Sequence, residues 1–227
     1  MATVNGDGST PLRLDLGCGN AKRPGFVGLD VFPGEQVDHV LDLTADPFPF
    51  ADDTVDEVFS AHFLEHIDEP NHVFSEIGRV CRDGARIEFW TPYAWTNEAL
   101  LYGHLHGITE EMWTHLGLSH RDIYSAMLRG HWLLVRFIFV IDQAVIDDLA
   151  RHGVDLDFAV RYYKGVVREF GVEAEYRSDL ATPPRTPERV YATERFGVRK
   201  PLTTRGAPMT ASVWRRGVRK VKRTLAR

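Results

Sequence analysis

The sequence lacks the features of secreted, disulfide-stabilised and membrane-spanning proteins. Two cysteines, Cys18 and Cys81, among 227 residues are too few for a disulfide framework or a cysteine-rich metal site. The longest apolar stretch, Trp132–Ile141, is interrupted by Arg136 and has about half the length that a membrane-spanning helix needs. Residues 1–9 are polar and carry no basic-then-apolar signal pattern. These absences predict a cytoplasmic protein.

Acidic and basic residues are unevenly distributed along the chain. The net charge is −5, and the contents of 26% charged and 44% hydrophobic residues are typical of a globular protein. All 32 acidic residues precede Arg195, and from there on the charged residues are only Lys and Arg. We therefore expect an acidic domain, residues 1–180, followed by a proline-containing arm and basic tail, residues 181–227.

The basic tail has two interpretations. Clusters of Lys and Arg such as those in Val213–Arg227 can bind the phosphates of nucleic acid or of a membrane. Apart from Trp214, the tail lacks the aromatic residues that alternate with basic ones in a base-stacking surface. We therefore do not expect nucleic-acid binding. We expect the tail to pack on its own acidic domain or on a second subunit of a homo-oligomer.

The first half of the chain alternates between short apolar runs and polar loops. Strands are predicted at Leu12–Leu16, Phe26–Val31, Val37–Leu43, Val55–Ala61 and Ala85–Thr91. Apolar residues at helical spacing predict a helix over Asn71–Val80, which Asp83 and Gly84 end. This alternation predicts an α/β fold with a doubly wound, mostly parallel sheet that helices cover.

The second half is less regular. Tyr93–Leu128 is rich in aromatic residues and histidine without a clean period, so we interpret residues 93–141 as a helical insertion after the fifth strand. Trp132–Ile141 is a buried strand or helix, between which periodicity does not decide. Helical spacing predicts a helix over Asp155–Phe170. Strict alternation predicts a strand over Val172–Leu180 with one wet face, near the edge of the sheet.

The strongest chemical signal is the run LRLDLGCGN, residues 12–20. Gly17 and Gly19 follow the first strand and, without Cβ atoms, let the backbone approach a ligand at the carboxyl end of the sheet. Asp15 and Asp30 end adjacent strands, where Asp15 can pair with a ligand ammonium and Asp30 can accept hydrogen bonds from a ribose diol. A glycine-rich turn without a ligand fits this short motif equally well.

The spacing of the motif argues against a dinucleotide. A nicotinamide dinucleotide site needs three glycines and an acidic residue about 20 positions further on, whereas Ala21 takes the third glycine position and Asp30 comes sooner. Pro24 and Gly25 leave a short helix or none after the first strand, and a pyrophosphate needs the N-terminus of that helix. S-adenosylmethionine (SAM) has no phosphate and does not need this helix.

Several motifs occur in a recognisable order within residues 12–92, namely DLGCGN, PGFVGLD, VLDL, PFPFADDTVDEVFSAHFLEHI and RVCRDGARIEFWTP. In this order they resemble class I SAM-dependent methyltransferases of the methyltransferase-11-like group. The resemblance implies a seven-stranded, mostly parallel Rossmann-like sheet and SAM as the cofactor. Ala21 and the run CRDG at residues 81–84 depart mildly from the family pattern. Residues 93–141 depart from it strongly, which leaves the acceptor open.

The resemblance also implies which residues hold SAM. They are Asp15, Gly17, Cys18, Gly19, Asn20, Asp30, Val31, Asp42, Leu43, His62 and Leu64. Within this set, the glycine loop would hold the methionine part, Asp30 the ribose hydroxyls, and Asp42 with Leu43 the adenine. His62 would follow the fourth strand beneath the methionine part.

Methyl transfer to a hydroxyl needs a base that takes the proton as the new bond forms. His62, Glu65 and His66 all follow the carboxyl end of the fourth predicted strand, and histidine suits this role at neutral pH. We predict His66 as the base, with Glu65 and His62 as further catalytic candidates. The alternative is that His62 and Glu65 only shape the cofactor pocket.

Eight of the ten histidines fall within residues 62–131. We predict that Tyr93, Trp95, His104 and His106 line the acceptor site, because flat aromatic faces stack on sugars and rings. His106 aligns loosely with an acceptor-site histidine of related methyltransferases. Burial in the core explains the aromatic residues equally well, also for Trp113 and Trp132. His104 and His106 could instead ligate a metal ion such as Mg²⁺ together with an acidic residue, although their spacing matches no defined metal motif.

The resemblance implies the class of acceptor. Actinobacterial enzymes of this appearance often methylate sugars, so we expect O-methylation of a sugar or of an oligosaccharide or polysaccharide precursor. The alternatives are an O- or N-methyltransferase of a small natural-product scaffold, an RNA-directed enzyme, and a SAM-binding protein with little catalysis.

Overall fold

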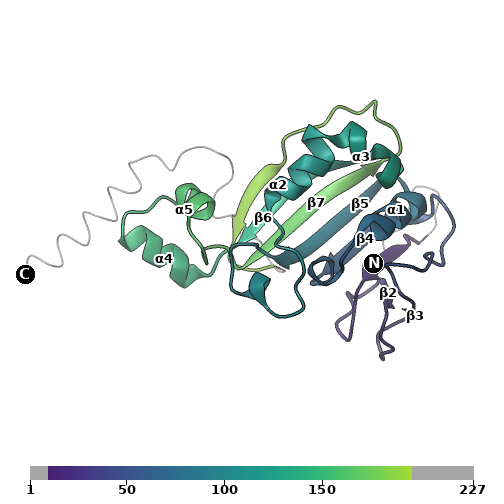
Figure 1. Cartoon of the computed structure of the whole chain (residues 1–227), viewed down its shortest axis with the longest axis horizontal. Coiled ribbons are helices and arrows are strands. Elements are labelled where there is room, and N and C mark those ends of the chain that lie inside the picture. The colour runs from purple at the N-terminus through teal and green to yellow at the C-terminus, as the bar shows by residue number, and fades with distance from the viewer. Residues whose placement is uncertain (1–9, 196–227) are drawn as a thin grey trace, which may run out of the picture.

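The computed structural model describes residues 10–195 (Figure 1). The basic tail, with both of its interpretations, lies outside the described residues. One sheet of eight strands has the order β3-β2-β1-β4-β5-β7-β6-β8. The strands are β1 (Arg13–Leu16), β2 (Val27–Asp30), β3 (His39–Val40), β4 (Val55–Ala61), β5 (Cys81–Pro92), β6 (His131–Val140), β7 (Glu169–Arg177) and β8 (Glu188–Ala192).

The topology confirms the predicted fold class. The chain starts at β1 inside the sheet, adds β2 and β3 on one side, and then returns to add β4 and β5 on the other. Among the eight strands of the described residues, β7 alone runs antiparallel to its neighbours. The count exceeds the expected seven because β8 forms within residues 181–227, which we had interpreted as a proline-containing arm and basic tail.

Helices join some of the strands, and three of them cover one face of the sheet. They are η1 (Leu64–His66), α1 (Asn71–Val80), η2 (Glu98–Leu100), α2 (Glu110–Thr114), the π-helix η3 (His115–Ser119), α3 (Arg121–Leu128), α4 (Gln143–Arg151) and α5 (Leu156–Tyr162). Figure 1 shows α1, α2 and α3 together over the sheet, with α4 and α5 beyond its end. Helix α1 has the predicted bounds, since Val73, Phe74, Ile77 and Val80 form one buried face.

The aromatic residues after β5 build the core under these helices. Trp113 and Trp132 stack on Phe89 and on each other, with ring centroids 5.3, 5.7 and 5.9 Å apart. Both tryptophans are 1% exposed. Burying rings of this size contributes roughly 2–3 kcal/mol each. The segment Trp132–Ile141, left open between helix and strand, therefore packs as strand β6.

Strand β7 corrects two predictions. It lies between β5 and β6 rather than near an edge, and it starts at Glu169, so the predicted helix over Asp155–Phe170 is too long and ends at Tyr162 in α5. The polar face of the strand is paired rather than wet. The carboxylate of Glu173 lies 3.3 Å from the guanidinium of Arg86 and 2.8 Å from that of Arg136 on the neighbouring strands.

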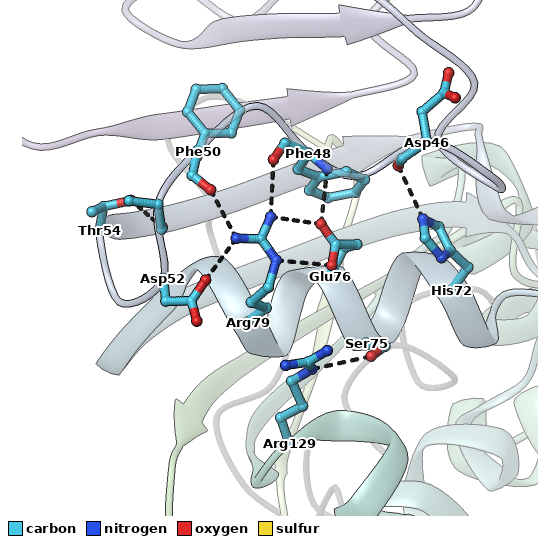
Figure 2. Close-up of polar contacts among 11 residues, drawn as sticks. Asp46, Phe48, Phe50, Asp52, Thr54, His72, Ser75, Glu76, Arg79 and Arg129 are labelled. Atoms are coloured by element: carbon cyan, nitrogen blue, oxygen red, sulfur yellow. Dashed lines mark hydrogen bonds and ion pairs between the residues drawn. The ribbon is translucent and has the colours of Figure 1, made fainter.

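The loop between β3 and β4 is fastened to α1, as Figure 2 shows. The guanidinium of Arg79 donates to Glu76 through Nε at 2.9 Å and Nη2 at 2.6 Å, and to Asp52 in the loop at 2.7 Å. Two turns before Arg79, Nε2 of His72 lies 2.9 Å from the carbonyl oxygen of Asp46. These contacts position the loop that follows the end of β3.

The described helices are all too short or too polar to cross a bilayer, within residues 10–195.

Candidate functional site

The carboxyl ends of β1, β2 and β4 meet where the strand order reverses. Strand β1 pairs in parallel with β2 on one side and with β4 on the other, which brings Gly17, Asp30 and His62 to one edge of the sheet. Two cavities open there. One of about 760 Å³ borders Asp15, Gly17, Cys18 and His62. The other, of about 580 Å³, borders Gly17, Asp30, Val31, Asp42, Leu43, His62 and His66.

Gly17 is the backbone position that both cavities share with His62. Its φ of +67° is left-handed, and a Cβ atom built on it would lie 2.7 Å from the Phe63 ring. Conformation and space therefore both require glycine here. As predicted, turns rather than a helix follow β1 in the described residues 17–26. The backbone of Gly17, which carries no side chain, therefore faces both cavities.

Asp30 ties the two loops around the cavity together. Its Oδ2 accepts from the amide of Gly19 at 2.8 Å, and its Oδ1 accepts from the amide of Phe32 at 2.9 Å. Each carboxylate oxygen keeps a further lone pair for a hydroxyl donor. The geometry suits a vicinal diol, and it places Gly19 behind Asp30 rather than in the wall of either cavity.

Asp15 and Cys18 line the larger cavity. Oδ2 of Asp15 accepts from the amide of Arg23 at 2.7 Å, and burial raises the pKa of Asp15 to about 6. An ammonium group in this cavity would stabilise the ionised carboxylate. Burial raises the pKa of the Cys18 thiol to about 11, so Cys18 is a neutral wall residue at neutral pH.

Asp42 and Leu43 border the smaller cavity just after β3. Oδ1 of Asp42 accepts from the hydroxyl of Thr44 at 2.7 Å and from its amide at 2.9 Å. These two bonds hold the pKa of the Asp42 carboxyl below its usual range. The buried side chain of Leu43 belongs to the core. An ionised acceptor beside an apolar wall suits a purine ring with an amino group.

His62 is held between two buried carboxylates. Its Nδ1 lies 3.1 Å from Oε1 of Glu65, and its Nε2 lies 2.8 Å from Oε1 of Glu169. The hydrogen bonds to Glu169 and then Glu65 raise the pKa of His62 to about 9. The imidazolium donates from both nitrogens at neutral pH and has no lone pair for a proton. This arrangement favours the pocket-shaping interpretation of His62 over the base role.

Glu169 is a site residue that sequence reasoning missed. It lies 107 positions from His62 and belongs to the strand β7 whose start we predicted at residue 172. Its Oε1 also lies 2.8 Å from Nε of Arg195. No local pattern marks it, because an isolated Glu before an alternating strand is common.

The loop after β5 docks on η1 through three hydrogen bonds. The amide of Leu105 donates to the carbonyl of Glu65 at 2.7 Å. Nδ1 of His66 lies 3.1 Å from the carbonyl of Gly103, and Nε2 of His106 lies 2.8 Å from the carbonyl of Asp68. Because a carbonyl only accepts, His66 donates through Nδ1 and keeps a lone pair on Nε2. His66 therefore fits the predicted base geometrically.

Several residues that we predicted for the acceptor and cofactor sites do not border the two cavities. The hydroxyl of buried Tyr93 donates to Glu110 at 2.6 Å, so the core interpretation holds for Tyr93 as for Trp113 and Trp132. Trp95 is 55% exposed and is the predicted aromatic residue available to a ligand. The remaining two members of the predicted cofactor set border neither of the two cavities. These are Leu64, which is buried in the core, and Asn20, which is exposed.

Comparisons with known proteins report on the domain and the fold. A family model described as a methyltransferase domain matches residues 27–89, which run from β2 into β5. No curated protein matches the sequence. The structure is similar to that of a SAM-dependent methyltransferase from Archaeoglobus fulgidus, with 15% identity, a TM-score of 0.52, and coverage of 73% of this chain and 86% of that chain.

Two further structures are similar at lower scores. A SAM-dependent methyltransferase from Methanosarcina mazei has 14% identity and a TM-score of 0.45, with 73% of this chain and 92% of that chain covered. A geranyl diphosphate C-methyltransferase from Streptomyces coelicolor A3(2) has 17% identity and a TM-score of 0.42, with 73% of each chain covered. The fold is the Rossmann-like fold of class I methyltransferases, and with the family match it supports a SAM-dependent methyltransferase.

Proposed function

We propose that the protein transfers a methyl group from SAM, which lies across the two cavities at the ends of β1, β2 and β4. The observation that carries this proposal is that Gly17 and His62 border both cavities. One elongated ligand can therefore occupy both. Asp30 and Asp42 suit its adenosine part, and Asp15 suits the ammonium of its methionine part.

When bound, SAM supplies an electrophilic methyl group on a sulfonium. The chain's contribution is to hold that group and a nucleophile in line, which can supply several kcal/mol of the lowering of the barrier. Asp15 and Asp30 fix the two ends of the ligand. Glu65 and Glu169 fix His62 at the junction of the cavities.

We propose a hydroxylated acceptor, a sugar or a precursor of an oligosaccharide or polysaccharide. His66 supports this, because it borders the smaller cavity and, with Nδ1 bonded to the carbonyl of Gly103, its neutral ring keeps a lone pair on Nε2 that can take a hydroxyl proton. Trp95, His104 and His106 follow β5 and offer the acceptor one aromatic face and two imidazoles. The cytoplasmic location, the homo-oligomer and the Mg²⁺ ion remain predictions.

One observation favours the second candidate, a methyltransferase of a natural-product scaffold. Leu100, Leu101, Tyr102 and Leu105 have side chains that are more than half exposed on the same loop that docks on η1. An apolar acceptor would cover them. The acceptor screen below includes both classes.

Calorimetric titration with SAM and with its demethylated product tests the cofactor assignment. A screen of sugars and apolar scaffolds with a radiolabelled methyl donor tests the reaction. We expect His66→Ala to lower turnover about 100-fold or more while the Kd for SAM stays within twofold. His152→Ala, at an exposed position after α4, is the matched control. Unchanged turnover in His66→Ala would remove His66 from the base role.

A further inference from the structure

Two buried polar atoms of residues close to His66 have no hydrogen-bond partner among the described residues. They are Oε2 of Glu65 and Nδ1 of His104. Glu65 is 1% exposed, so water does not compensate its carboxylate from the surface. A buried unsatisfied polar atom costs about 1–3 kcal/mol, and more when it is charged. Two such atoms on facing segments suggest that they share a ligand.

These two residues and His66 form a compact group. One ligand atom from each of Glu65, His66 and His104 lies within 4.8 Å of the other two. The rings of His66 and His104 are nearly perpendicular, at 87°, with centroids 4.6 Å apart. An ion that binds at about 2.0–2.2 Å from each ligand needs them roughly 3.5 Å apart. Any pair of these atoms that is farther apart than this must close by side-chain rotation when an ion binds.

Neighbouring groups orient two of the three ligands. Nδ1 of His66 is hydrogen-bonded to the carbonyl of Gly103 at 3.1 Å, which leaves Nε2 as the atom that can bind a metal ion. Oε1 of Glu65 is hydrogen-bonded to Nδ1 of His62 at 3.1 Å, which leaves Oε2 as the carboxylate oxygen that can bind a metal ion. Metal-binding histidines and carboxylates are commonly oriented in this way by a second hydrogen bond.

We propose that Glu65, His66 and His104 bind one divalent transition metal ion, with an open position toward the cavity that His66 borders. Two imidazoles and a carboxylate suit Zn²⁺ and similar ions, whereas Mg²⁺ prefers oxygen ligands. Three protein ligands leave a position for water or a hydroxyl. An ion on Nε2 takes the lone pair that a base needs, so the base role of His66 applies to the metal-free protein alone.

The described residues contain a rival pair of histidines that serves as a control. The rings of His115 and His120, at the start and just past the end of η3, lie 4.1 Å apart, centroid to centroid. The group of three close metal-binding side chains in the described residues includes neither of them. His115→Ala therefore removes a competing imidazole without touching the proposed site.

The test uses the tag-free full chain, stripped with a chelator and titrated with Zn²⁺. We expect one equivalent to bind with micromolar or tighter Kd, and His104→Ala and Glu65→Gln each to weaken binding at least tenfold. His115→Ala should bind as the parent does. Co²⁺ should give the visible absorption of a four-coordinate nitrogen and oxygen site, which His104→Ala should lose.

Each contrary result overturns the proposal. Stoichiometry below half an equivalent, equal affinity in His104→Ala, loss of binding in His115→Ala, or displacement of Zn²⁺ by millimolar Mg²⁺ would each do so. Tryptophan fluorescence shows whether a variant is folded, and His104→Ala, on a surface loop, backs up Glu65→Gln. SAM titration of the same samples tests the cofactor assignment separately, because the Zn²⁺ titration is carried out without SAM.

Discussion

Replacing Arg79 with Met would break the buried ion pair that fastens the β3–β4 loop to α1. The Arg79 side chain is 17% exposed and that of Glu76 is 8% exposed. Besides Glu76 and Asp52, the guanidinium donates to the carbonyls of Phe48 at 2.9 Å and Phe50 at 2.8 Å (Figure 2). The hydrogen bond from Arg79 holds the pKa of the Glu76 carboxyl below its usual range, so Glu76 is ionised at neutral pH.

The expected loss in the free energy of unfolding follows from the Glu76 carboxylate, which stays buried without Arg79. Methionine keeps most of the apolar packing of the Arg79 stem but leaves the Glu76 carboxylate buried, with the amide of Phe48 still donating at 2.8 Å. Removing one partner of a buried pair costs about 3–5 kcal/mol. The bond to Asp52, which is 68% exposed, adds under about 1 kcal/mol. We expect Tm to fall by roughly 10 °C.

Urea unfolding of the full chain, followed by the fluorescence of the buried tryptophans, measures this loss. The double variant Glu76→Gln/Arg79→Met removes the stranded charge and should recover more than half of the stability. Because the folded pKa of Glu76 is lowered, the stabilisation is present above the unfolded pKa and disappears as pH falls through the folded value. Parent and single variant should therefore converge in acid. A loss under 1 kcal/mol, or a double variant no more stable than the single one, would refute the argument.

Three further predictions concern the cavities. Gly17→Ala should weaken SAM binding at least tenfold in calorimetry, because the added Cβ would lie 2.7 Å from Phe63. Gly25→Ala is the control and should bind SAM nearly normally. Gly25 is also left-handed, with φ +82°, but a Cβ added there has no atom within 4 Å. Asp30→Ala should also weaken SAM binding at least tenfold, and equal affinity would overturn the ribose assignment. SAM affinity should fall as pH drops through the Asp15 pKa of about 6, because the ammonium needs the carboxylate. Asp15→Asn should bind weakly at every pH, and an unchanged pH profile in this variant would exclude Asp15.

Local patterns accounted for much of the fold. Helix α1 was predicted with its bounds, and the first strands were predicted within a few residues, because a buried helical face and an apolar run between turns depend on neighbouring residues alone. Strand β7 shows where this reasoning stops. Alternation separated its apolar from its polar residues but predicted neither its place nor the pairing of its polar face, since the arginines that pair with Glu173 come from β5 and β6.

Parts of the candidate site could likewise be located from the sequence, whereas others depend on tertiary packing. The glycine loop and the acidic ends of β1 and β2 could be located from the sequence, because turn chemistry and strand ends are encoded within a few positions. The clamp of Glu169 on His62 and the meeting of His66 with His104 arise from strand order and from the docking of a loop. Such contacts join residues tens of positions apart, and only the packing of the whole chain brings them within bonding distance.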